Sequence, residues 1–191
     1  VADRIEAGTF LCAVAAAGGD AVLRHARADH LDVVIEKLRD AGATLEPLAD
    51  GIRVTSPGAA ALKSQGFRTT EYPGFPTDLQ APFTVLLTQA EGDSLVHETI
   101  FDGRLFFTDK LNMMGARITL LDPHRAIVHG ATPLRGKRVD SPDIRAGLAL
   151  LIAGLAAEGE TVLGNIYQID RGYERVEERL TAVGARITRQ E

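Results

Sequence analysis

Three apolar stretches recur along the chain, and each ends in a glycine followed by an acidic residue. They cover residues 7–20, 78–93 and 143–160 and are rich in Ala and Leu. Within 146–157 no helical face is polar, and the stretch is too short to span a bilayer. We therefore predict three helices that are buried on all sides.

Amphipathic segments follow the apolar stretches. In the first, residues at i, i+3, i+4 and i+7 are apolar with charged residues between them, namely Leu31, Val34, Ile35 and Leu38. The last such segment repeats the pattern with Val176, Leu180 and Val183. This spacing predicts helices with one buried face. Short β-prone stretches follow or join these helices, at 21–26, 51–56, 94–100, 117–122, 125–130, 161–166 and 185–189.

One short phrase occurs three times: KLRDAGATLE, KLNMMGARIT and RLTAVGARIT. Its glycines, Gly42, Gly115 and Gly184, recur at a period of about 70 residues and suit helix ends that need a positive φ. We interpret the chain as a single α/β (α+β) domain of three units, approximately 1–65, 66–135 and 136–191. The apolar helices would lie inside, with sheets and amphipathic helices around them.

Composition excludes some classes of binding partner but does not indicate a particular function. The formal charge is −5, there is no Trp, and the chain has only three Tyr and seven Phe, so a nucleic-acid-binding surface is not expected. The one Cys fits a reducing compartment, and no segment is typical of a membrane span or a signal peptide. These observations predict a cytoplasmic protein with neither a nucleic-acid nor a membrane partner.

Candidate functional residues lie where the units stop matching, in the segments 72–80, 97–104, 141–147 and 169–175. Each has an ordinary structural interpretation. Thr77 could cap a helix that starts beside Asp78, and Ser141 one that starts beside Asp143. Asp170 could also be a cap, and Arg104 a turn residue, whereas Arg145 and Arg171 could be surface arginines. Taken together, carboxylates and arginines at the unit joints suit an anionic ligand.

The cysteine and the histidines give no clear indication of a catalytic or metal site. Cys12 lies inside an apolar stretch, where burial is more usual than nucleophilic use. The five histidines show no metal-ligand spacing, and no glycine-rich phosphate loop is present. No metal or cofactor is expected.

Several of these segments resemble one family. GFPTDLQA, HETIF followed by Arg104, DIRAG, GLAAEGET and IDRGYERVEERL are similar to the UDP-N-acetylglucosamine 1-carboxyvinyltransferases, which are enolpyruvyl transferases of peptidoglycan synthesis. The resemblance covers essentially the whole chain and corresponds to the C-terminal one of two domains in that family. It implies an inside-out α/β barrel of three βαβαββ-type repeats, with helices inside and sheets outside.

The same resemblance implies substrates and site residues. The substrates would be phosphoenolpyruvate and UDP-N-acetylglucosamine, bound between this domain and an N-terminal domain that carries the catalytic cysteine. Asp78, Asp143 and Arg171 match catalytic positions. The substrate-binding positions are Asp78, Ile100, Phe101, Arg104, Arg145 and Arg171. The 191 residues alone are expected to fold without catalysing transfer.

Three positions depart from the family pattern: Pro82, Met113 and Gln168, where Gln, Arg and His are usual. Two alternatives therefore stay open. The chain could belong to another enolpyruvyl transferase, such as 3-phosphoshikimate 1-carboxyvinyltransferase. It could also be a non-catalytic paralogue or binding module.

Overall fold

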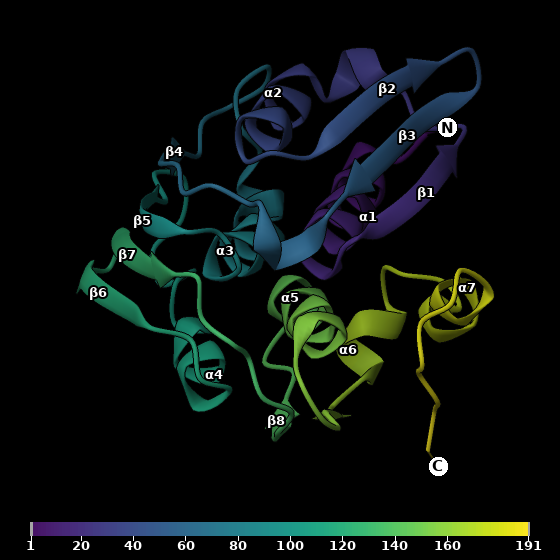
Figure 1. Cartoon of the computed structure of the whole chain (residues 1–191). Coiled ribbons are helices and arrows are strands. Elements are labelled where there is room, and N and C mark those ends of the chain that lie inside the picture. The colour runs from purple at the N-terminus through teal and green to yellow at the C-terminus, as the bar shows by residue number, and fades with distance from the viewer. Residues whose placement is uncertain (1, 191) are drawn as a thin grey trace.

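Three apolar helices form the centre of the computed structural model, which describes residues 2–190. They are α1 (Arg4–Ala17), α3 (Gln80–Thr88) and α5 (Ile144–Ala156), and each packs against the other two (Figure 1). Every residue of α3 is buried, as are half of the residues of α1 and just over half of those of α5. The three predicted apolar helices are therefore present, but only α3 is buried on all sides, as predicted for all three. Among the described residues, no helix has the length and apolar character that a membrane crossing requires.

The first sheet lies on one side of this helical centre. It has the order β1-β3-β2, with antiparallel pairing of β1 (Gly19–Arg24) to β3 (Gly51–Ser56) and of β3 to β2 (Thr44–Leu48). The amphipathic helix α2 (Asp32–Asp40) follows a short 3-10 turn, η1 (Ala28–His30), and buries its apolar face. Inward-facing Ile52 and Val54 of β3 are fully buried.

The second sheet repeats this order and adds one strand, giving β4-β5-β7-β6. The added strand β4 (Phe67–Arg68) runs parallel to β5 (Gly92–His97), whereas β7 (Arg125–Gly130) is antiparallel to both β5 and β6 (Ile118–Asp122). Helix α4 (Thr108–Met113) takes the place that α2 has in the first unit. Two 3-10 turns, η2 (Gly58–Ala60) and η3 (Thr77–Leu79), lie between β3 and α3.

The third sheet is smaller. It consists of β8 (Arg138–Asp140) paired in parallel with β9 (Val162–Gly164), followed by α6 (Tyr167–Asp170) and α7 (Val176–Ala182). The predicted amphipathic helix is thus confirmed, with Val176 and Leu180 buried, but Val183 lies beyond its end and is exposed. The strand predicted at 185–189 is wrong for this structure, because that segment has no hydrogen-bonded neighbour strand among the described residues.

The architecture is a mixed α/β fold with three separate sheets outside a helical centre (Figure 1). Within the described residues these sheets do not join into a closed barrel, so the inside-out barrel is not confirmed. The third sheet has two strands where the second has four, which leaves part of the circumference without strands. The boundaries of the three units stay a prediction.

The repeat glycines all have a positive φ, of 106° at Gly42, 102° at Gly115 and 99° at Gly184. Their surroundings differ. A Cβ at Gly42 would lie 2.9 Å from the carbonyl oxygen of Ala61, whereas a Cβ at Gly184 would meet no atom of the described residues within 4 Å. The sequence therefore predicted the backbone conformation at these sites, and the tertiary structure decides the space around them.

This difference predicts unequal costs of substitution. Gly184→Ala is expected to lower the free energy of unfolding by about 1 kcal/mol, because an L-residue is strained at positive φ. Gly42→Ala is expected to cost about 1–3 kcal/mol more, since its methyl group also overpacks against a carbonyl. Urea unfolding of the two variants, which serve as controls for each other, measures the difference. Equal destabilisation would contradict the packing at Gly42.

Candidate active site

Asp78 lies at the centre of the candidate site, in the 3-10 turn just before α3. Its Oδ1 accepts a hydrogen bond from Nη1 of Arg104 at 3.0 Å, and a second from Nε of Arg145. The three side chains come from three separate segments of the chain. The structure therefore brings together three of the residues that the sequence singled out.

The charge state of Asp78 follows from this environment. Partial burial raises the pKa of Asp78, but the hydrogen bonds and positive charges of Arg145 and Arg104 outweigh it and hold that pKa below its ordinary range. Asp78 is thus a carboxylate at neutral pH. While both guanidinium groups stay in place it is a good hydrogen-bond acceptor and a weak base.

Glu98 is a site residue that the sequence interpretation missed, although it belongs to the HETIF segment. Its side chain is fully buried, and both carboxylate oxygens accept hydrogen bonds. Oε1 accepts from the hydroxyl of Thr69 at 3.0 Å and from the backbone N–H groups of Ile100 and Phe101. Oε2 accepts from the hydroxyl of Thr77 at 2.8 Å. The signal in the sequence was an acidic residue directly after a strand whose inward positions, Ser94 and Val96, are buried.

These contacts explain two differences from the sequence prediction. The strand predicted at 94–100 ends at His97, because the carboxylate of Glu98 takes the N–H groups that would otherwise continue the ladder. Thr77 is not a helix cap, since its hydroxyl donates to Glu98 and accepts from Arg104 instead. Glu98 thereby links the 98–104 loop to the turn that carries Asp78.

Arg104 is more than a turn residue. Its side chain is only 19% exposed, and Nη1 donates to Thr77 at 2.8 Å as well as to Asp78. The guanidinium also lies over the ring of Phe101, 4.2 Å from the ring centroid, which is a cation–π contact. Phe101 is itself half exposed, and Ile100 is partly buried beside it.

Asp143 begins α5, which corrects the predicted helix start. Asp143 itself is the N-cap and accepts hydrogen bonds from the N–H groups of Arg145 and Ala146. Ser141 does not cap the helix, because its hydroxyl donates to the carbonyl of Asp143. The cap fixes the first turn of α5 and so positions Arg145 toward Asp78.

Arg171 lies outside this cluster. It follows α6, is exposed, and donates to the side-chain oxygen of Gln168 at 3.4 Å. The next residue, Gly172, packs against Ile144 in the first turn of α5. Asp170 is the last residue of α6 and pairs with Arg189, so it is not a cap. The structure therefore places Arg171 near the start of α5 without contact to Asp78.

Tyr173, two residues after Arg171, connects this segment to the helical centre. Its hydroxyl shares a hydrogen bond of 3.0 Å with Thr9 of α1, and its ring meets Phe10 edge to face. Burial raises the pKa of Tyr173, and the negative charge of Asp78 acts in the same direction. Tyr173 thus stays neutral and anchors the IDRGYER segment.

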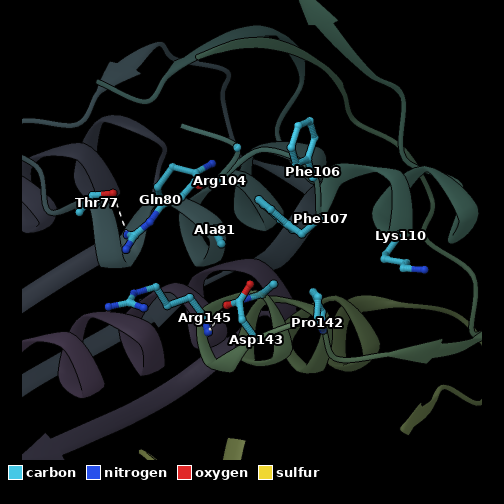
Figure 2. A pocket seen from close by; sticks show the side chains of 12 residues that line it. Thr77, Gln80, Ala81, Arg104, Phe106, Phe107, Lys110, Pro142, Asp143 and Arg145 are labelled. Carbon is cyan, nitrogen blue, oxygen red and sulfur yellow. Dashed lines mark hydrogen bonds between the residues drawn. The ribbon is translucent and has the colours of Figure 1, made fainter. Parts of the chain in front are cut away.

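A cavity of about 330 Å³ lies between the start of α3, the 103–110 segment and the start of α5 (Figure 2). Arg104, Lys110 and Arg145 supply positive charge to its lining, and Asp143 supplies negative charge. Phe106, which is 66% exposed, and Phe107 add aromatic surface that the sequence interpretation did not assign. The excess of cations suits an anionic ligand.

The described residues were also compared with what a metal site or a cysteine nucleophile requires. Among residues 2–190, no group of three or more His, Cys, Asp and Glu side chains could hold a metal ion. Cys12 is fully buried, and this burial raises the pKa of its thiol far above the ordinary value. Two of the positions that depart from the family pattern have different surroundings. Pro82 is buried in α3, whereas Met113 is exposed at the end of α4.

Comparison with known proteins agrees with this fold. Among solved structures, the enolpyruvyl transferase NikO from Streptomyces tendae is 28% identical with a TM-score of 0.85, over 96% of this chain and 43% of that one. An EPSP synthase from Acinetobacter baumannii is 19% identical with a TM-score of 0.72, over 99% of this chain and 44% of that one.

This chain therefore spans less than half the length of these solved relatives. The family model of EPSP synthase (3-phosphoshikimate 1-carboxyvinyltransferase) matches residues 1–180. The chain belongs to the EPSP synthase family of enolpyruvyl transferases.

Proposed function

We propose that this chain is one half of an enolpyruvyl transferase, and that it supplies an acid–base carboxylate and anion-binding arginines to the reaction. The observation that carries the proposal is the Asp78 carboxylate held between Arg104 and Arg145, next to a cation-rich cavity. Family membership supplies the reaction type.

The reaction requires the groups that this site offers. An acceptor hydroxyl adds to C2 of phosphoenolpyruvate while C3 gains a proton. Loss of a proton from C3 then expels inorganic phosphate and leaves the enolpyruvyl ether. The chemistry needs a base for the hydroxyl proton and cations for a carboxylate and a phosphate. Bidentate guanidinium groups suit both anions.

We assign the roles accordingly. Asp78 accepts the proton of the acceptor hydroxyl, once the anionic substrates draw Arg104 and Arg145 away from it. Arg145 and Arg171 bind phosphoenolpyruvate, and Arg171 reaches it from the segment beside α5. Asp143, which lines the cavity as the cap of that helix, lies beside the reacting carbon.

The proposed acceptor is UDP-N-acetylglucosamine, with Ile100, Phe101 and Arg104 beside the sugar nucleotide. Its support is the sequence resemblance over the site segments. This acceptor would place the enzyme in cytoplasmic peptidoglycan synthesis. The alternative acceptor is 3-phosphoshikimate, which the matching family model names. Both acceptors combine a reactive hydroxyl with a phosphate-bearing group, and the arginines of this site suit either.

We also propose that a second domain covers this site. The solved relatives are more than twice as long as this chain, and the side chain of Asp78 is still 31% exposed in this domain. Such a domain would complete the substrate cleft and supply the catalytic cysteine. We do not expect Cys12 to take that role, because it is buried in α1 away from the site.

The test is phosphate release from phosphoenolpyruvate with each acceptor in turn. The complete enzyme is expected to turn over with UDP-N-acetylglucosamine, and the 191-residue chain is expected to show no turnover above the blank. Turnover with 3-phosphoshikimate alone would favour the alternative acceptor. Turnover by the 191 residues alone would contradict the need for a second domain.

A further inference from the structure

His124 lies in the turn between β6 and β7 and contacts the loop that carries Phe101 and Arg104. The backbone carbonyl of His124 accepts a hydrogen bond of 2.8 Å from the N–H of Glu98. Its ring Nδ1 lies 2.9 Å from the carbonyl oxygen of the same glutamate. Both backbone polar groups of Glu98 are therefore bound to one residue that is 26 positions away in the sequence.

The second ring nitrogen of His124 reaches the other end of the same stretch. Nε2 lies 3.1 Å from a carboxylate oxygen of Asp102, which is followed two residues later by Arg104. One imidazole thus contacts the first and the last residue of 98–102. On the inner side, the buried Glu98 carboxylate accepts hydrogen bonds from two backbone N–H groups of this stretch. The stretch is therefore held from both sides.

The two contacts of the ring indicate its charge. A carbonyl oxygen and an ionised carboxylate can only accept hydrogen bonds. Each ring nitrogen of His124 must therefore carry a proton in order to donate, and a neutral imidazole carries only one. The arrangement fits an imidazolium. When the ring loses a proton, it loses the hydrogen bond either to the carbonyl of Glu98 or to Asp102.

Other charged and titratable groups surround His124. Asp122, at the end of β6, accepts hydrogen bonds from Nε of Arg125 and from the N–H of His124. These two bonds hold the pKa of Asp122 below its ordinary range, so Asp122 stays ionised. His97 ends β5 and pairs with Arg125 in the register of β5 and β7. Histidine ordinarily changes charge between about pH 5 and 8, so an experiment must separate His124 from His97.

The first unit shows which of these contacts belong to the repeated fold. After β1, the N–H of His25 donates to the carbonyl of Asp50 in the turn between β2 and β3, as Glu98 donates to His124. The backbone bond therefore recurs in two sheets. The side-chain contacts differ, because in the first unit a histidine at the strand end, His25, binds the turn residue Asp50. In the second unit a histidine in the turn binds the loop.

We propose that His124 is a positioning residue for the 98–104 loop, and that its imidazolium keeps Phe101 and Arg104 in place beside Asp78. Arg104 donates to Asp78, and its guanidinium lies over the ring of Phe101. A loosened loop moves both members of this cation–π pair, and with them the cation beside the carboxylate. The consequence for catalysis rests on the proposed function, whereas the effect on the loop does not.

Two substitutions in the 191-residue chain test the contact to Glu98. His124→Ala removes it, so amide hydrogen exchange at Ile100 and Phe101 should accelerate about 3- to 10-fold, the usual effect of one hydrogen bond. His124→Asn should restore most of the protection, because its NH₂ group can donate in place of Nδ1. The amides of α3 report any change in overall stability. The matched control is His25→Ala, which removes an exposed histidine–aspartate contact on the first sheet and should leave both amides unchanged.

The dependence on pH tests the charge of the ring. The imidazolium binds through both nitrogens and the neutral ring through one, so the stabilisation is present at low pH and is lost as the pH rises. Between pH 5 and 8 the protection factors of Ile100 and Phe101 should fall about 2- to 5-fold, since an exposed ion pair contributes little. His124→Asn should abolish this dependence, because asparagine does not titrate, whereas His97→Asn should retain it.

The complete enzyme gives a second measurement. His124→Ala should raise KM for the acceptor about 3- to 10-fold with a smaller change in kcat, because Arg104 is displaced while Asp78 stays available as the base. His124→Asn should return KM to near the unmodified value. A catalytic role of the ring would instead lower kcat in both variants, and that result would overturn positioning.

The exchange measurements decide the proposal without any substrate. Equal protection of Ile100 and Phe101 in the unmodified chain and in His124→Ala would overturn the positioning role. Equal acceleration in His25→Ala would do the same. A pH dependence that survives in His124→Asn would overturn the imidazolium. An enzyme without transferase turnover would contradict the proposed function, and the exchange results would stand.

Discussion

Asp78→Asn is expected to reduce kcat of the complete enzyme by about 10²- to 10⁴-fold, the usual contribution of a positioned general base. Asparagine keeps the shape of the side chain and can still accept a hydrogen bond from Arg104 or Arg145. It cannot accept the proton of the acceptor hydroxyl. The loss should therefore appear in kcat, with KM changed much less. Initial rates of phosphate release at saturating phosphoenolpyruvate and acceptor measure it.

The same variant should bind anions more tightly. In the 191-residue chain, the Asp78 carboxylate competes with any anion for Arg104 and Arg145. Removing its charge frees two guanidinium groups, so isothermal titration with inorganic phosphate should show a lower Kd for Asp78→Asn. Opposite effects on turnover and on phosphate binding distinguish a catalytic carboxylate from a residue that only maintains the fold.

Asp20→Asn is the matched control. Asp20 also accepts two hydrogen bonds from one arginine, Arg53, but this pair lies on the first sheet and is well exposed. Exposed ion pairs contribute little to stability, so turnover and phosphate binding should both stay as in the unmodified protein. Near-normal turnover of Asp78→Asn, or equal losses of turnover in Asp78→Asn and Asp20→Asn, would contradict the role assigned to Asp78.

Glu98→Ala is expected to lower the free energy of unfolding of the 191-residue chain by about 2–5 kcal/mol. The substitution leaves four donors without their acceptor, one of them buried and three partly buried. A fully buried unsatisfied group costs about 1–3 kcal/mol before the loop relaxes. Urea unfolding measures the change. Amide exchange at Ile100 and Phe101 should accelerate as well, because both N–H groups lose the same carboxylate oxygen.

Two further variants refine this prediction. Glu98→Gln keeps one oxygen for the N–H groups of Ile100 and Phe101 but places an NH₂ group near Thr77, so it should destabilise less than alanine does. Glu91→Gln, an exposed glutamate just before the same strand, should change stability by less than about 0.5 kcal/mol. If Glu98→Ala unfolds at the urea concentration of the unmodified chain, the network around Glu98 is not what holds the loop.

The candidate site could be predicted only in part. The sequence singled out Asp78, Arg104 and Arg145 because they interrupt the repeats, and the structure brings these three together. It did not predict Glu98, Lys110, Phe106 or Phe107, since an isolated acidic residue, a lysine and two aromatics carry no spacing signal. It also grouped Arg171 with the others, although that side chain contacts Gln168 in this structure. Contacts between side chains far apart in the chain are not encoded in local patterns.

The sequence by itself determined the local structure. Apolar stretches without a polar face had to become buried helices, the i, i+3, i+4 pattern fixed the amphipathic helices, and glycine was required where φ is positive. These properties depend on a residue and its near neighbours. Helix starts were predicted less well, because Thr77 and Ser141 had other partners in space.

Only the tertiary structure decided how many strands each sheet has and which polar groups meet. Residues 185–189 have the composition of a strand but pair with no strand among residues 2–190, because a strand exists only where a neighbour accepts its hydrogen bonds. Asp78 is likewise an ordinary acidic residue until Arg104 and Arg145 arrive from elsewhere in the chain and set its charge. Pairing and electrostatics depend on distances that the linear order of residues does not contain.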